Sequence, residues 1–238
     1  MGFSDLETVM KRLLDDGKYT DMTISCQGHD FNVHRAIVCS QSHFFDAALK
    51  GGFQVSRFFL SSHRVSDSQG QEADSSQVKL PFDHVDVIAL VVEYCYFQDY
   101  GREDDSLKLE SDETAYTHLR VYIAADKFGI FPLCDLAATR IIAWIDSNWR
   151  SKSFLGVAQR IWNKCPSHEN KLREAIIKKV STNIQHFLAQ GKGNIGLFGN
   201  PTFLLAILKG VATENHNLTE ANSMLAQQNK VRKGIGLR

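Results

Sequence analysis

Hydrophobic and polar positions alternate with a period of two early in the chain. The alternation runs over residues 22–26 and resumes over residues 31–33, on either side of the turn-forming residues 27–30. A period of two is typical of strands that bury one face. The pattern therefore predicts a two-stranded hairpin.

The spacing of apolar positions becomes helical directly after this hairpin. Residues 34–39 and 44–49 each carry a short helical pattern, and Ser42 stands where an N-cap of the second helix is expected. The pair Gly51-Gly52 is expected to close that helix. Two short consecutive helices are therefore predicted.

A longer apolar segment marks the expected centre of the domain. Residues 84–97 are apolar nearly all round, which is typical of a fully buried helix. A brief strand over residues 78–80 precedes it, and residues 101–113 read as a polar loop. Further helices are expected over residues 119–128 and 132–145.

The N-terminal residues form an amphipathic pattern of their own. Ser4 and Glu7 have the spacing of a capping box, and Leu6, Val9 and Leu13 repeat on one helical face. We expect a leader helix over residues 1–16 that needs a partner surface.

The C-terminal third is predicted to be helical and then flexible. Helical patterns occupy residues 154–165, 167–189 and 203–211, the last of them capped by Asn200-Pro201. Residues 212–238 are polar with a basic end, so we expect a flexible tail there. The basic end has the charge of a nuclear-localisation signal or a nucleic-acid contact, although a solubilising tail is the simpler interpretation.

Composition narrows the classes of function. The 238 residues are 43% hydrophobic, enough for a core, and the formal net charge is zero at a pI near 7.1. A balanced charge provides no field that would attract nucleic acid or an anionic membrane. With no apolar run of about 18 residues and no signal-peptide pattern, we expect a cytoplasmic and/or nuclear protein without direct nucleic-acid or membrane partners.

One cluster of residues has the spacing of a zinc site. Cys26, His29, His34 and Cys39 follow the pattern C-x2-H-x4-H-x4-C. Core-facing residues interleave with them, which a small zinc knuckle would not need. The favoured interpretation is that the two thiols are buried and reduced, and that His34 bonds the backbone.

No motif indicates catalysis. Residues 191–196 satisfy G-x-G-x-x-G, but a helix precedes them where a dinucleotide-binding turn requires a strand. Nucleophile-elbow, phosphate-loop and H-E-x-x-H motifs do not occur in the sequence. We therefore predict no catalytic residues, metal, cofactor or small-molecule substrate.

The order of these signals resembles the BTB/POZ domain. The resemblance rests on Asp21 at the first strand, on the run Phe31-Asn32-Val33-His34-Arg35-Ala36-Ile37-Val38, and on Ser42 followed by Phe45. It is similar to the short BTB proteins of filamentous fungi, which lack Kelch repeats and zinc fingers. The implied fold is α+β, a helical cluster flanked by a small sheet of three or more strands.

This resemblance also implies a domain organisation. The BTB/POZ domain would occupy residues 17–148 and carry an insertion at 55–71. A short all-helical extension over residues 149–211 would follow it and precede the tail.

The resemblance implies a homodimer. In BTB proteins that carry such a leader helix, the helix packs across the dimer interface. The resemblance implies the same role for Leu6, Val9 and Leu13 in this chain. Asp21 and Arg35 stand at positions that form a charged pair in the pocket at the dimer seam, while the alternative is an exposed pair of little energetic weight.

Three functions follow, in descending order. The first is a homodimeric protein–protein interaction module, of which a substrate adaptor that recruits a Cullin-3 ubiquitin ligase is one form. The second is a transcription-associated scaffold that binds corepressor-like peptides at the dimer pocket. An unrecognised enzyme ranks last.

Residues 55–71 interrupt the family pattern and have the features of a retained intron. Removing these seventeen codons preserves the frame and joins Gln54 to Glu72. Val55-Ser56 can be encoded by GTNAGT and Gln71 by CAG, the usual intron ends. The junction would bring Phe53 and Glu72 into the apolar-x-Glu element that binds Cullin-3 in BTB adaptors.

Overall fold

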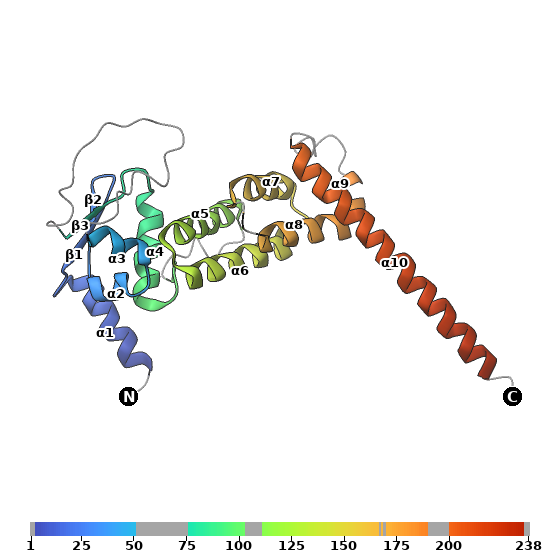
Figure 1. Cartoon of the computed structure of the whole chain (residues 1–238), viewed down its shortest axis with the longest axis horizontal. Coiled ribbons are helices and arrows are strands. Elements are labelled where there is room, and N and C mark those ends of the chain that lie inside the picture. The colour runs from blue at the N-terminus through green and yellow to red at the C-terminus, as the bar shows by residue number, and fades with distance from the viewer. Residues whose placement is uncertain are drawn as a thin grey trace. The chain divides into compact units, whose positions relative to one another are not determined.

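The computed structural model describes residues 3–50, 76–102, 111–166, 168, 170–189 and 200–235. The chain divides into two compact units, Met1–Arg140 and Ile141–Arg238. The first contains the sheet and α1 to α5, and the second contains α7 to α10 (Figure 1). Helix α6 (Phe131–Asn148) crosses the boundary between the two units, because the first unit ends at Arg140, inside this helix. We had expected the BTB-like domain to end at residue 148, which is the last residue of α6.

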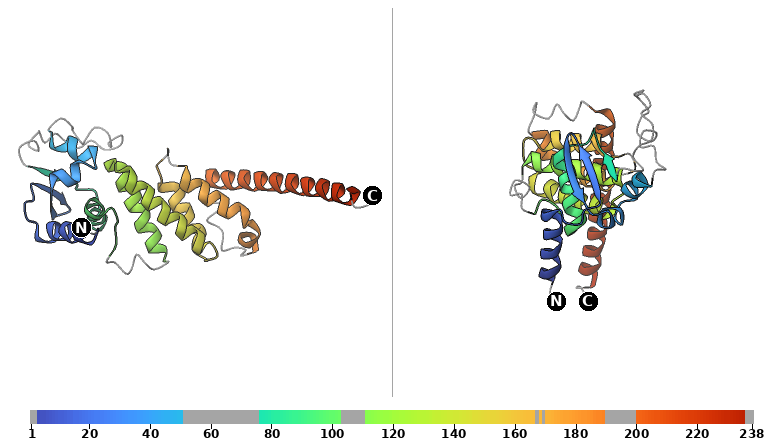
Figure 2. Two further views of the ribbon diagram at one scale, coloured as in Figure 1. Left: turned by 90° about the horizontal axis from the view of Figure 1, so that it is seen from below. Right: turned by 90° about the vertical axis from the view of Figure 1, so that its left-hand side faces the viewer.

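The first unit contains a small sheet. Its strands are β1 (Met22–Cys26), β2 (His29–Val33) and β3 (Gln77–Lys79), in the order β2-β1-β3 (Figure 2). β1 is antiparallel to β2 and parallel to β3. The alternation seen in the sequence places Met22 and Ile24 on the buried face.

The hairpin turn is shorter than predicted. Gln27 and Gly28 alone form it, with φ angles of 49° and 84°, and His29 already pairs with Cys26. Two consecutive residues with positive φ match the twist of antiparallel strands, which is why two-residue hairpin turns favour them. Residues 29–30 therefore belong to β2.

Helices pack against the sheet and against one another. α2 (Arg35–Cys39) and α3 (His43–Leu49) follow the hairpin, and the predicted buried helix is α4 (Val85–Phe97). α4 packs against α1 (Phe3–Asp16), α2, β2 and α5 (Asp112–Phe128). This many-sided packing explains why α4 is apolar nearly all round.

Local capping signals fix the ends of α3 and α5. The Ser42 hydroxyl oxygen accepts a hydrogen bond from the backbone N–H of Phe45, as predicted. α5 begins earlier than the apolar stripe indicated, because Ser111 caps it, and it ends at Gly129 with a φ of 67°. The Gly51-Gly52 pair lies outside the described residues.

The second unit is all-helical. It comprises α7 (Phe154–Lys164), α8 (Lys171–Thr182), α9 (Ile184–Ala189) and α10 (Pro201–Ile235). Phe154 stacks between Trp144 and Phe187, with ring centroids 6.0 and 5.7 Å away. Stacked aromatic rings bury large apolar areas and so form the centre of this unit.

Two predictions for this unit were wrong. The single helix expected over residues 167–189 is two helices, because the chain leaves helical geometry at Asn183. The tail expected to be flexible from Ala212 is instead the second half of α10. Polar composition alone does not exclude a helix, and no proline interrupts residues 212–235.

Among the described helices, none is long and apolar enough to cross a membrane.

Candidate functional site

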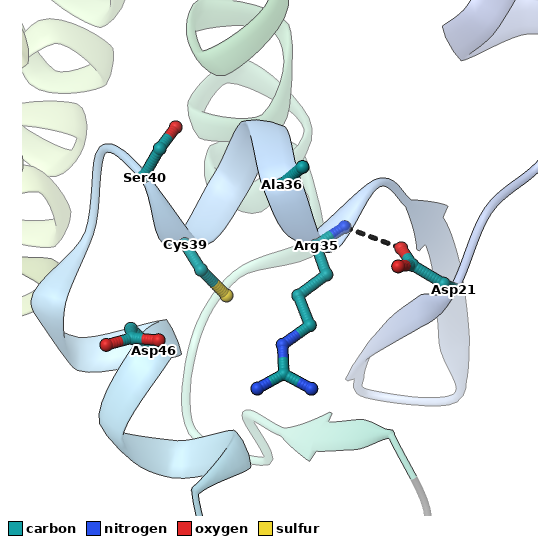
Figure 3. A pocket seen from close by; sticks show the side chains of 6 residues that line it. All are labelled: Asp21, Arg35, Ala36, Cys39, Ser40 and Asp46. Atoms are coloured by element: carbon teal, nitrogen blue, oxygen red, sulfur yellow. Dashed lines mark hydrogen bonds between the residues drawn. The ribbon is translucent and has the colours of Figure 1, made fainter.

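An open pocket of about 420 Å³ lies where β1 begins and α2 and α3 meet (Figure 3). Both residues that we assigned to the dimer pocket line it. The full lining consists of Asp21, Arg35, Ala36, Cys39, Ser40 and Asp46.

Most of this lining was not predicted from the sequence, although a signal was present. Arg35, Ala36, Cys39 and Ser40 are spaced i, i+1, i+4 and i+5, the spacing of residues on one helical face. Asp46 comes from the next helix, and no local pattern points to it.

Asp21 and Arg35 are in contact, but not through a side-chain ion pair within one chain. The backbone N–H of Arg35 donates to Asp21 Oδ1 over 2.7 Å. Both residues are exposed, and the Arg35 side chain extends away from the Asp21 carboxylate (Figure 3). The buried charged pair that we considered is therefore absent from the single chain, and the carboxylate serves the backbone instead.

This contact replaces a missing helix cap. His34 occupies the N-cap position of α2, but its side chain makes no capping hydrogen bond. The first N–H groups of a helix have no partner inside the helix. The Asp21 carboxylate, brought from the start of β1, accepts one of them.

Cys39 adds a thiol to the pocket. Partial burial raises its pKa, and the nearby positive charge of Arg35 opposes that rise without cancelling it. The reactive form of cysteine is the thiolate. A raised pKa therefore makes Cys39 a weak nucleophile.

His34 holds the hairpin, the loop before it and α4 together. Its Nε2 lies 2.8 Å from the carbonyl oxygen of Lys18, and its Nδ1 lies 2.6 Å from the Tyr96 hydroxyl. Because a carbonyl oxygen only accepts, Nε2 of the neutral ring carries the hydrogen, and Nδ1 accepts from the Tyr96 O–H. This confirms the interpretation that His34 bonds the backbone.

The four residues of the zinc spacing have different surroundings in the structure. The Cys26 thiol is buried and donates to the Asp83 carbonyl over 3.2 Å, while His29 is exposed on β2. Burial, aided by the negative charge of Asp83, raises the pKa of Cys26. Within the described ranges, no three His, Cys, Asp or Glu side chains are grouped to hold a metal ion.

Helix α1 carries the second predicted surface. Leu6 and Val9 are 58% and 47% exposed, whereas Leu13 is half-buried. An ion pair between Glu7 and Arg102 ties α1 to the segment after α4. The exposed part of the apolar stripe is thus held in a defined position.

The remaining predicted features lie outside the described residues. They are Phe53, Glu72, the insertion at 55–71 and the glycine-rich residues 191–196.

No curated protein matches the chain at a significant level. Residues 10–109, less than half of the chain, match the BTB/POZ domain family. This range includes the whole sheet, α2 to α4 and every residue of the pocket. The chain therefore contains a BTB/POZ domain, a protein–protein interaction module.

Proposed function

We propose that this BTB/POZ domain forms a homodimer with α1 at the seam. The observation that carries the proposal is the exposed apolar stripe of Leu6 and Val9 on a helix anchored by the Glu7–Arg102 ion pair. Removing apolar side chains from water favours association. A second copy presents the same stripe and so can cover it.

Light scattering on purified protein tests the homodimer. The double variant Leu6→Asp/Val9→Asp should be a monomer, because two carboxylates would have to enter an apolar contact. Lys11→Asp adds the same side chain on the opposite face of α1 and should leave the dimer intact. A monomeric wild-type protein at tens of micromolar, or equal loss in both variants, contradicts the proposal.

Leu13→Asp is a weaker test of the same seam. Leu13 is half-buried within its own chain, so a charge there also disturbs the packing of α1. The exposed positions 6 and 9 avoid this ambiguity.

The role that we propose for the dimer is that of a substrate adaptor for a Cullin-3 ubiquitin ligase. Support comes from the family match and from the sequence around Phe53 and Glu72. We propose that the insertion at 55–71 separates these two residues. The full chain should then bind Cullin-3 weakly, and a chain lacking residues 55–71 should bind it better.

Calorimetric titration of Cullin-3 into each of the two forms measures this difference in affinity. Phe53→Ala in the shortened form should return binding to the level of the full chain. Equal binding by both forms contradicts the mechanism. If every transcript contains the codons for residues 55–71, the interpretation of this segment as a retained intron is wrong.

A scaffold that binds corepressor-like peptides is the second candidate. The open pocket favours it, because Arg35 and Asp46 offer both signs of charge beside a polar Ser40. Affinity purification from cytoplasmic and nuclear fractions separates the candidates. Cullin-3 in the purified complex supports the adaptor, whereas chromatin factors whose capture is lost in Arg35→Ala support the scaffold.

An enzyme remains the lowest-ranked alternative. Burial raises the pKa of Cys26 and Cys39, and that of Cys95 to about 12. These thiols are therefore poorly suited to nucleophilic catalysis.

A further inference from the structure

Helix α10 extends well beyond the surface on which it packs. Near its start, Phe203 and Ile207 are buried, and Gly210 lies against Ile177 and Ser181 of α8. From residue 215 to residue 229, every side chain is exposed. The red helix in Figure 1 and in the left view of Figure 2 shows this second half continuing past α7 to α9.

The projecting half has little to stabilise it as a lone helix. Residues 213–229 are rich in Thr, Asn, Ser and His, which are poor helix formers. Among its described side chains, the one ion pair joins His216 to Glu220 and is charged only when His216 is protonated. Helices without tertiary contacts are marginal in water, so this segment needs a partner surface.

The sequence of this segment repeats every seven residues. Val211, Leu218 and Leu225 are seven residues apart and lie on one face. Asn215, Asn222 and Asn229 repeat with the same period, each four residues after an apolar position. These are the d and a positions of a heptad, and the two sets together form the seam of a two-stranded coiled coil.

The asparagines identify the partner. An amide side chain both donates and accepts hydrogen bonds, so Asn222 is satisfied by a second Asn222. In a parallel pair, a positions face a positions and d positions face d positions. An antiparallel pair would instead place each asparagine opposite a leucine or valine and leave buried amides without partners.

The flanking positions are compatible with this arrangement. The e positions are Ala212, Thr219 and Ala226, and the g positions are Glu214, Ala221 and Gln228. In a parallel dimer each g residue faces an e residue of the other helix. Glu214 therefore meets Thr219 of the second copy, and no like charges oppose each other across the seam.

We infer that residues 211–229 of α10 form a parallel, in-register two-stranded coiled coil with the same segment of a second copy of this chain. A coiled coil with only three apolar layers, separated by layers of asparagine, is a weak dimer by itself. The inference therefore rests on the proposed homodimer, which holds two copies of α10 in one particle and raises their effective concentration.

Disulfide cross-linking of the full chain tests the register. Under mild oxidation, Leu225→Cys should give a high yield of covalent dimer, because identical d positions meet in a parallel pair. Met224→Cys is the matched control, since it is an exposed neighbour at an outward c position. The unmodified chain reports on its native thiols. Equal yields from the two variants would overturn the coiled coil.

The asparagine layer has a separate test. Valine and asparagine have similar helix propensities, so Asn222→Val changes little on a solvated helix. At an a position it should strengthen self-association several-fold, whereas Asn217→Val at an outward position should not. Equal association of the two variants in sedimentation experiments would contradict the inference.

Failure of the coiled coil can be distinguished from failure of the proposed homodimer. A wild-type dimer whose Leu225→Cys and Met224→Cys variants cross-link equally overturns the coiled coil and leaves the BTB dimer standing. Selective cross-linking of Leu225→Cys that persists in the Leu6→Asp/Val9→Asp background supports the coiled coil and contradicts the seam at α1.

Discussion

The Asp21 carboxylate accepts a hydrogen bond from the backbone N–H of Arg35 over 2.7 Å, at the first turn of α2. The two residues thus interact through the backbone of one and the side chain of the other. The charge of Arg35 is not needed for this contact, and its side chain remains part of the pocket lining.

The backbone contact predicts unequal effects at the two positions. Asp21→Ala should lower the free energy of unfolding by about 1 kcal/mol, as the loss of a helix cap does. Asp21→Asn should cost less, because an amide oxygen also accepts, and Arg35→Ala should stay within about 0.5 kcal/mol. Urea denaturation measures all three. If Arg35→Ala were as unstable as Asp21→Ala, the interpretation as a buried ion pair would be favoured instead.

Tyr96 should be important for stability through its hydroxyl. The oxygen accepts from the backbone N–H of His34 at 3.0 Å and also bonds the ring of His34. Tyr96→Phe leaves these groups without a partner and should cost about 1–3 kcal/mol of unfolding free energy. Tyr94→Phe, which removes a hydroxyl with no hydrogen-bond partner among the described residues, should cost less. Equal losses in denaturant titrations would argue against the contact.

His118 should make stability depend on pH in the acid range. Burial and the positive charge of Arg140 lower its pKa from 6.5 to about 4. Between these values the unfolded chain binds a proton that the folded chain does not. Stability is therefore full above pH 6.5 and is lost as pH falls toward 4, with a slope approaching about 1.4 kcal/mol per pH unit.

His118→Gln removes the side chain that takes up this proton in the unfolded chain, so it should flatten the dependence of stability on pH. Glutamine can still accept from the Tyr100 hydroxyl, which lies 2.9 Å from His118 Nδ1. His29→Gln makes the same change at an exposed position and should keep the slope of the wild type. Thermal melts between pH 7 and pH 4 compare the three proteins. A slope unchanged in His118→Gln would contradict the assignment.

Two glycines in helices of the second unit should respond with opposite signs to alanine. A Cβ at Gly210 would lie 2.5 Å from Ile177 Cγ2 and 2.7 Å from Ser181 Oγ, so Gly210→Ala should cost about 1–3 kcal/mol. Gly156→Ala meets nothing within 4 Å and should stabilise by up to about 1 kcal/mol. Calorimetric unfolding decides, and a stabilising Gly210→Ala would mean that α10 does not pack closely on α8.

The local pattern of the sequence determined the elements of the first unit. The period of two predicted β1, the all-round apolar segment predicted α4, and Ser42 was correctly identified as the cap of α3. Such features are set by residues within one or two turns of each other. A short sequence window therefore carries the information.

Composition was a poorer guide than period at the C-terminus. We predicted a flexible tail because residues 212–238 are polar, but the structure continues α10 to Ile235. The spacing of Val211, Leu218 and Leu225 is present in the sequence and points to a helix. Only the structure shows that every side chain from residue 215 to residue 229 is exposed.

The candidate site depended on tertiary structure. The sequence identified Asp21 and Arg35, but the fold decided that the carboxylate of one caps the backbone of the other and that Asp46 joins them in one pocket. The Ser42 hydroxyl likewise donates to the Phe128 carbonyl, 86 residues away, over 2.6 Å. Periodicity reports which face of an element is buried, whereas such partners depend on how distant elements pack together.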